Sequence, residues 1–406
     1  MDLILRNARL ASGRLVDIGV ARGRIVAIEA GLAAEAEELD VGGRLVSPGF
    51  VETHLHLDKA CILDRCDQHG DLDAAIREVA RVKAAFTPED VYARAKRVLE
   101  RCILNGTTLI RTHLEVDPGI GLRGLEGVLP LVKEYAWAVD LEICVFPQEG
   151  LLNRPGTEEL MVAALRRGGK AIGACPYTDT NPHGQIDRIF TLAREFGVDI
   201  DMHLDFDLDP EDMDLPYVCR RAEEFSYGGR VTVGHVTKLS VLEPQSQTAV
   251  ARRLADAGVA LTILPSTDLY LARPMGRHGT ARGVAPAHRF LAGGVNCSLA
   301  TNNVLNPFTP FGDGSLIRMA NLYANVCQLG MPDIVQCFDM ITARAAALMN
   351  LRGYGVEIGN DADLVVLDCD SPGAAICELA PVLHAFKRGV KTVTRPPPIL
   401  HRHGQA

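Results

Sequence analysis

Residues 50–57 read FVETHLHL, and this stretch decides the fold because an apolar strand pattern carries two histidines at alternate positions. Alternate residues on a strand point the same way, so His54 and His56 can face one ion together. The same arrangement, an apolar run that ends in histidine and a polar turn, recurs at His203 in DIDMHLD and at His235 in VTVGHV. Imidazole is a common metal ligand in proteins. Four histidines at predicted strand ends therefore indicate a metal-centred hydrolase.

Strand-like and helix-like segments alternate through the middle of the chain. The candidate strands are FVETHLHL (50–57), TTLIRTHLEV (107–116), DLEICVFPQ (140–148), KAIGACPY (170–177), VDIDMHLD (198–205), RVTVGHV (230–236), VALTILPST (259–267) and VNCSLATNN (295–303). Amphipathic stretches separate them, for example PEDVYARAKRVLERCILNG (88–106) and GTEELMVAALRRGG (156–169), which carries helix-boundary residues at both ends. Eight β-then-α units predict an α/β fold, a (β/α)8 TIM-type barrel over residues 49–351. A doubly wound open sheet is the alternative.

The predicted strands all end in polar side chains. In chain order these are His54 and His56, His113, Gln148 and Glu149, Tyr177 and Thr178, His203, His235, Ser266 and Thr267, and Asn302 and Asn303. In a TIM-type barrel the chemistry lies at the carboxyl ends of the strands. We therefore expect these side chains to surround one site.

Both ends of the chain read as short strands with glycine at the turns. LILRNARL (3–10) and GNDADLVVLD (359–368) are examples of this pattern. We predict that residues 1–48 and 352–406 pair into one small flanking β domain beside the barrel.

The composition is that of an ordinary globular protein. The 406 residues are 47% hydrophobic and 23% charged, which suits a barrel and a smaller domain. A net charge of −9 argues against non-specific nucleic-acid binding, which needs a basic surface. No apolar run reaches membrane-spanning length, and the start, MDLILRNARL, does not resemble a signal peptide. We predict a cytoplasmic protein with no nucleic-acid or membrane partner.

The eleven cysteines are scattered and include no C-x-x-C pair, so a structural zinc site is not predicted. Several lie inside apolar runs such as LEICVF and VNCSL. Free cysteine behaves there as a small buried hydrophobe, which is the state we expect.

Seven segments together resemble the amidohydrolase superfamily over nearly the whole chain. They are SPGFVETHLHLDKA, RTHLEV, VFPQEG, AIGACPY, DMHLD, VGHVT and NNVLNPFTPFGDGS. The likeness is greatest to the cytosine deaminase branch, which includes N-isopropylammelide aminohydrolases. The flanking β domain is also typical of that superfamily.

The resemblance implies that His54, His56 and His203 ligate one divalent metal ion, with zinc or iron expected. Gln148 would hydrogen-bond the ring of a flat, polar heterocycle, and His235 would contact the metal-bound water or the developing oxyanion. No bridging carboxylated lysine is evident in AIGACPY, which favours one metal ion over two. Members of the family form homo-oligomers, and the resemblance implies the same here.

Two positions depart from the family pattern. Asn302 stands where the family has an aspartate beside the metal; its amide oxygen can ligate, but it is a very poor base. Phe206 stands where cytosine deaminase has a glutamate, a position at which the triazine aminohydrolases also differ. Asn302 stays a candidate for the metal site and for catalysis. His235 becomes the candidate base, because the ordinary pKa of histidine, near 6.5, suits neutral pH.

Other polar residues in these motifs have open roles. A replacement carboxylate is sought among the aspartates after His203, which are Asp205, Asp207 and Asp209. His113 is expected to support the metal ligands or the packing. Lys59 is expected to be solvated or salt-bridged, with a substrate contact as the alternative.

The sequence thus predicts a metal-dependent hydrolase that deaminates an amino-substituted nitrogen heterocycle, pyrimidine- or triazine-like, with metal-bound hydroxide. Two alternatives remain open. One is ring-opening hydrolysis of a cyclic amide, which creates a carboxylate and releases no ammonia. The other is a catalytically impaired relative that only binds its ligand, which Asn302 would favour.

Overall fold

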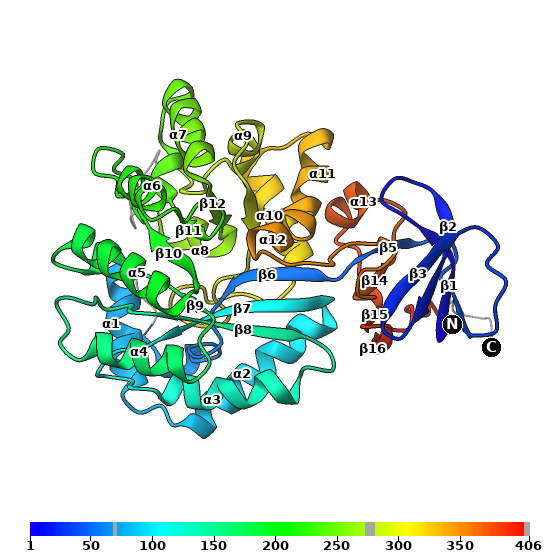
Figure 1. The fold of residues 1–406 in the computed structure, drawn as a ribbon, viewed down its shortest axis with the longest axis horizontal. Coiled ribbons are helices and arrows are strands. Elements are labelled where there is room, and N and C mark those ends of the chain that lie inside the picture. Colours follow the sequence, from blue (N-terminus) through cyan, green and yellow to red (C-terminus); the bar gives the residue numbers. More distant parts are fainter. Residues whose placement is uncertain (68–70, 273–280, 402–406) are drawn as a thin grey trace.

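The computed structural model of the protein describes residues 1–67, 71–272 and 281–401 and contains an eight-stranded parallel sheet with helices around it (Figure 1). The strands follow one another in chain order: β6 (Phe50–Leu55), β7 (Thr107–Glu115), β8 (Asp140–Phe146), β9 (Ala171–Ile172), β10 (Asp199–Leu204), β11 (Val231–His235), β12 (Val259–Ile263) and β13 (Cys297–Leu299). The sheet closes where Leu55 forms a parallel bridge with Asn302. This closure confirms the TIM-type barrel and rules out the open sheet.

Helices follow the barrel strands and cover the outside of the barrel (Figure 1). They are α1 (Leu72–Lys83), α2 (Pro88–Leu104), α3 (Arg123–Glu134), α4 (Thr157–Arg166), α5 (Pro182–Phe196), α6 (Leu215–Glu224), α7 (Pro244–Ala257), α8 (Pro265–Leu271), α9 (Ala287–Ala292), α10 (Leu316–Cys327), α11 (Met331–Asp339) and α12 (Ala343–Leu348). One further helix, α13 (Pro372–Cys377), lies between two strands of the flanking sheet. Short 3-10 turns occur at η1 (Leu63–Arg65), η2 (Pro176–Thr178) and η3 (Thr237–Ser240).

Local sequence explains where the helices begin and end. Thr87 caps α2 because its side chain accepts a hydrogen bond from the backbone N–H of Asp90, and Pro88 occupies the first turn, where no backbone donor is needed. α4 ends at Arg166, just before the glycine pair 168–169. Both predicted helices are confirmed.

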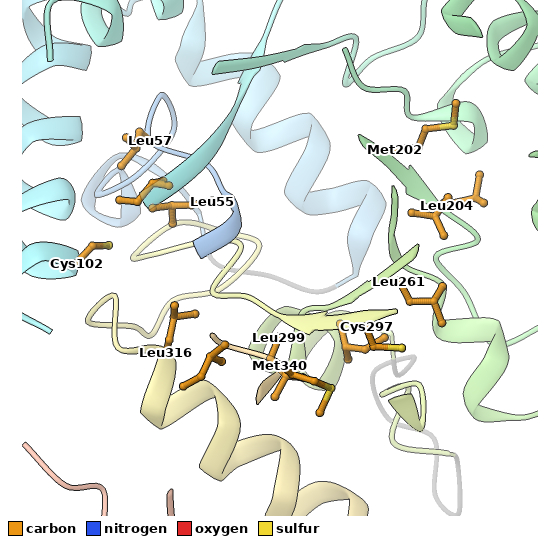
Figure 2. Close-up of a cluster of buried hydrophobic side chains, with 14 of the residues drawn as sticks. Leu55, Leu57, Cys102, Met202, Leu204, Leu261, Cys297, Leu299, Leu316 and Met340 are labelled. Carbon is orange, nitrogen blue, oxygen red and sulfur yellow. The ribbon is translucent and has the colours of Figure 1, made fainter. Parts of the chain in front are cut away.

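Side chains alternate between the inside and the outside of the barrel wall. On β10, Met202 and Leu204 belong to the apolar cluster that packs the wall against the helices (Figure 2). The residues that alternate with them on this strand, Asp201 and His203, therefore point inward. In the same way Leu55 lies in the cluster, and its neighbours on both sides are histidines. One period-two pattern thus builds the apolar core and carries polar groups into the barrel.

A bulge at β6 sets the direction of the first histidine. Glu52 pairs with Ile110 and Leu55 with Thr112, so β6 uses three steps where β7 uses two. Such bulges redirect side chains at the rims of barrels. The fully buried Glu52 carboxylate secures this segment by accepting hydrogen bonds from the backbone N–H groups of His54 and Thr301.

The two ends of the chain form a second sheet beside the barrel (Figure 1). Its strands are β1 (Leu3–Arg9), β2 (Leu15–Ala21), β3 (Arg24–Glu29), β4 (Glu37–Asp40), β5 (Leu45–Pro48), β14 (Leu364–Leu367), β15 (Val382–Lys387) and β16 (Val390–Thr394), in the order β16-β15-β14-β5-β1-β2-β3 with β4 on β1. The buried Lys387 ammonium joins the two parts, 2.7 Å from Asp140 of β8 and 2.5 Å from Asp363. The predicted flanking domain built from both ends is confirmed; its limits, 1–48 and 352–406, stay a prediction.

Two of the predicted strands are much shorter than expected. The fourth is reduced to Ala171–Ile172, after which the chain passes Gly173 and turns into η2. The eighth is reduced to Cys297–Leu299. All eleven cysteines are free, as expected; six are buried, four are half-buried and Cys377 is exposed. Among the described residues no helix is long and apolar enough to cross a membrane.

Candidate metal centre

Three histidines meet at the carboxyl ends of β6 and β10. The Nε2 atom of His203 lies 3.1 Å from Nε2 of His54 and 3.1 Å from Nε2 of His56. Two nitrogens bound to one tetrahedral zinc ion, with bonds of about 2.0–2.1 Å, would be roughly 3.3 Å apart. All three rings are buried. The structure therefore places His203 within 3.1 Å of both other histidines that the sequence assigned to the metal.

The surroundings of His54 and His56 leave their Nε2 atoms free to ligate. His56 Nδ1 donates to the backbone oxygen of His113 at 3.1 Å, which places the proton on Nδ1. His54 Nδ1 faces the Asp201 carboxylate at 3.6 Å. Burial lowers the pKa of His54, His56 and His203 well below the ordinary value, so the rings are neutral. Neutral imidazole is the form that binds metal ions.

This arrangement passes a direct test for a cation. With protons on Nδ1, the Nε2 lone pairs of His54 and His56 both point at His203, whose single Nε2 proton could satisfy only one of them. The buried Oδ1 of Asn302 also has no partner among the described residues. Unpaired buried acceptors cost about 1–3 kcal/mol each. A divalent cation fits this site, because it would bind the histidine lone pairs and the Asn302 oxygen together.

A buried carboxylate lies behind His54. Asp201 Oδ1 is 3.6 Å from His54 Nδ1 and 3.4 Å from His113 Nε2, and Oδ2 accepts from the fully buried Arg111 at 2.9 Å. The His113 ring stacks on His54 with centroids 3.7 Å apart. Groups behind metal ligands commonly fix their tautomer and orientation. The expectation that His113 supports the ligands or the packing agrees with this position.

His235 lies on the other side of the same cluster. The ligating atoms of His54, His203 and His235 all lie within 4.8 Å of one another. His235 Nδ1 is 2.6 Å from Oδ1 of Asp268, which is fully buried on α8. Because Nδ1 contacts the Asp268 carboxylate, Nε2 is the ring nitrogen that remains available to the metal centre.

A small pocket opens beside the histidines and is lined mainly by predicted site residues. Its lining is His56, Lys59, Leu72, Gln148, Tyr177, His203, Phe206, His235, Thr267, Asn302, Asn303 and Phe308. Phe206 packs edge-on against His235, with ring centroids 4.6 Å apart. Asn302 combines this pocket position with a left-handed backbone, φ 64°, which asparagine tolerates better than most residues. A larger, open groove lined by Arg65, Arg94 and Arg97 lies apart from this site.

The wall of the pocket at β7 and β8 is charged. Lys59 is buried, so the prediction that it is solvated was wrong. Its Nζ donates to Glu115 at 2.7 Å and to Gln148 Oε1 at 3.0 Å. Behind it, Lys83 contacts Glu115 at 2.9 Å, Asp117 at 2.6 Å and also Glu149. Burial would raise the pKa of Glu115, but the two lysine charges outweigh it and lower the value to about 2. The salt-bridged reading of Lys59 is thus confirmed.

The prediction that an aspartate after His203 supplies a replacement carboxylate was wrong. Asp205 accepts hydrogen bonds from the backbone N–H groups of Asp214 and Leu215 and so caps α6. Asp207 is exposed and pairs with Lys238 at 3.2 Å, and Asp209 is also exposed. The φ of Asp205, 49°, turns the chain away from the barrel mouth directly after the strand.

Sequence reasoning missed two carboxylates that matter. Asp201 stands two residues before His203 on the same strand, so period-two alternation could have placed both inside the barrel. Asp268 gave no comparable signal, because it follows the predicted strand end at Thr267 and reaches His235 across 33 residues of sequence.

Comparisons with known proteins agree with this geometry. The model of the amidohydrolase family, a metal-dependent family, matches residues 37–130 and 132–384. An N-isopropylammelide isopropyl amidohydrolase from Pseudomonas sp. (strain ADP) is 30% identical over 402 residues, which cover 96% of each chain. A pterin deaminase from Rhizobium rhizogenes is 29% identical, over 86% of this chain and 81% of its own.

Solved structures give the same result. A 5-methylcytosine deaminase from Klebsiella pneumoniae, liganded with 5-fluorocytosine, superposes with a TM-score of 0.94 at 28% identity over 100% of both chains. An N-isopropylammelide isopropylaminohydrolase from Burkholderia multivorans gives 0.84 at 26% identity, over 96% of this chain and 98% of its own. The chain belongs to the amidohydrolase family, in its cytosine deaminase and N-isopropylammelide aminohydrolase-like branch.

Proposed function

We propose that the protein is a hydrolase of carbon–nitrogen bonds that removes an amino or alkylamino group from a small nitrogen heterocycle. One divalent ion, zinc or iron, would be held by His54, His56 and His203, with the amide oxygen of Asn302 beside it. The observation that carries this proposal is the convergence of the three Nε2 atoms, 3.1 Å from His203 on both sides, at the edge of a small pocket.

The chemistry of such a centre needs an activated water and a base. A bound divalent ion supplies the first, because it can lower the pKa of a water molecule from about 15.7 to about 7. His235 supplies the second, since its Nε2 is free while Nδ1 is engaged by Asp268. Asn302 Oδ1 can accept a hydrogen bond there but cannot take up the proton.

The pocket favours a flat ring with hydrogen-bond acceptors on one edge. The Lys59 ammonium can only donate, so the Gln148 amide turns its oxygen toward it. Gln148 Nε2 donates one N–H to Cys175 Sγ at 3.3 Å, which leaves its second N–H for a ligand. The β7–β8 wall therefore offers N–H groups, which suit ring oxo groups or unprotonated ring nitrogens. Phe206 and Phe308 supply aromatic surface against which a flat ring can pack. The relatives that act on 5-methylcytosine and N-isopropylammelide support this substrate class.

The test combines metal analysis with a substrate screen. The purified protein should hold about one equivalent of divalent metal per chain. It should release ammonia or amine from at least one aminopyrimidine or aminotriazine with a ring oxo group. Removing His235 by His235→Ala should lower turnover by about 10²–10⁴-fold while metal content stays unchanged.

The screen also separates the alternatives. A new carboxylate without amine release would replace deamination by ring opening of a cyclic amide. Tight binding of these heterocycles without any turnover in the metal-loaded protein would favour the ligand-binding relative.

We also propose a cytoplasmic homo-oligomer. The family membership supports the assembly, and light scattering of the eluting protein at micromolar concentration measures it. A monomeric mass would contradict the assembly.

A further inference from the structure

The orientation of His235 is fixed from two sides. Its Nδ1 lies 2.6 Å from Asp268 Oδ1, and the edge-on Phe206 ring packs against it with centroids 4.6 Å apart. Its backbone has φ 69°, a left-handed conformation that non-glycine residues seldom adopt. The following N–H, of Val236, is bonded to the Leu204 oxygen at 3.0 Å, which holds this turn in place. Tertiary contacts therefore decide both where the ring lies and how it is rotated.

We propose that Asp268 is a positioning residue that locks His235 in the tautomer with its proton on Nδ1 and its Nε2 lone pair toward the pocket. A carboxylate only accepts hydrogen bonds, so the nitrogen facing it must carry the proton. Asp268 Oδ2 also accepts from the backbone N–H of Leu264 at 3.1 Å, so the carboxylate is itself held from both oxygens. His235 and Asp268 are both buried, and water does not compete for this bond.

The His235–Asp268 pair supplies the base that Phe206 and Asn302 cannot provide. Phe206 and Asn302 both line the pocket, and neither can accept a proton. In this protein the carboxylate is that of Asp268, which contacts His235 Nδ1 and does not line the pocket. During hydrolysis Nε2 of His235 would take one proton from the attacking water, and the new imidazolium would be stabilised by Asp268. The same proton would pass to the leaving nitrogen, so the ring gains oxygen, amine departs and His235 returns to its starting state.

The catalytic consequence rests on the proposed function, but the tautomer is a property of the protein alone and is measured without substrate. We would label the histidines of the full-length protein with 15N and assign the His235 signals by their loss in His235→Ala. The expected wild-type spectrum has a protonated Nδ1 and an unprotonated Nε2 at His235. In Asp268→Asn the amide can donate to Nδ1, so the proton should move to Nε2. In Asp268→Ala the two tautomers should be mixed.

Asp205→Asn is the matched control. Asp205 is also a buried carboxylate that follows a neighbouring strand, but it caps α6 through backbone N–H groups and does not touch His235. Its replacement is expected to lower stability and to leave the His235 signals unchanged. A general effect of losing a buried carboxylate would change the His235 signals in both variants. An effect on the His235 tautomer should appear only when Asp268 is replaced.

Turnover provides the second arm. If the proposed deamination occurs, Asp268→Asn should lower kcat by about 10²–10⁴-fold with little change in KM, because the base is lost and the pocket is kept. A wild-type His235 with its proton on Nε2, or an Asp268→Asn spectrum identical to wild type, would overturn the proposal. Absence of deaminase activity in the wild type would refute only the proposed function, since the spectra still decide the tautomer.

Discussion

The two walls of the pocket bury ionisable groups in opposite ways. On the histidine wall, burial lowers the pKa of His54, His56 and His203, so the rings are neutral. On the wall at β7 and β8, Lys59 and Glu115 keep opposite charges, because their attraction exceeds the cost of burial. Neutral rings leave lone pairs for a cation, whereas the paired charges of Lys59, Glu115 and Lys83 satisfy one another. The difference shows that burial alone does not decide what a site binds; the partners do.

Removing ligands from the histidine wall should have the largest effect. His56→Ala combined with His203→Ala takes away two of the three histidines, including His203, whose Nε2 lies 3.1 Å from Nε2 of each of the other two. We expect complete loss of bound metal and of activity, measured by elemental analysis after dialysis. His288→Ala, which removes a histidine bonded to Tyr323 outside the site, is the control and should keep its metal. Full metal retention in the double variant would refute the ligand assignment.

Breaking the charged wall should damage the fold instead of the metal site. Lys83→Met would leave Glu115, Asp117 and Glu149 without their shared cation in a buried setting. Loss of one partner from a buried ion pair costs about 3–5 kcal/mol of the free energy of unfolding. Urea unfolding of the apo protein measures this loss directly.

Lys96→Met is the matched control for that experiment. The pair between Lys96 and Glu134 is largely exposed, so its loss should cost less than about 1 kcal/mol. Equal effects of the two substitutions would show that the charged wall does not differ from a surface ion pair.

Asp201→Asn tests whether the histidine wall depends on the charge behind it. The amide keeps the shape of Asp201 but withdraws the carboxylate that faces His54 Nδ1 at 3.6 Å. Substitution of such supporting groups typically weakens metal affinity by about 10–100-fold, which competition with a chelator measures. Glu142→Gln removes the other carboxylate bonded to Arg111 and should leave the affinity unchanged. An equal loss in both variants would point to Arg111 and not to His54.

Asn302→Asp places a charge on the neutral wall and should have the smallest effect. A carboxylate can ligate and also accept a proton, so we expect tighter metal retention and a rise in turnover of about tenfold. Initial rates on an oxo-aminoheterocycle measure it. A fall in turnover with the metal still bound would mean that the chain works with asparagine, and that its chemistry differs from cytosine deamination.

Much of the candidate site could be predicted because strand patterns are local. The alternation in FVETHLHL and in DIDMHLD places polar groups inside the barrel and leucine or methionine outside, as β6 and β10 do. The resemblance added Gln148, His235 and Asn302, which all line the pocket. The limits of β9 and β13 were not predictable, because a strand extends only as far as its neighbours pair with it. For β9 that pairing ends at Ile172, opposite Ile200 and Val145.

By itself, the sequence determined the order of strands and helices, the barrel and the histidines at its mouth, since these follow from periodicity and from turn residues a few positions apart. Only the tertiary structure decided which carboxylates support those histidines and which charges are buried together. Asp268 reaches His235 across 33 residues and Lys59 reaches Gln148 across 89. Such pairs form because barrel closure removes water from side chains that have no local relationship, and each buried polar group must then find its partner in space.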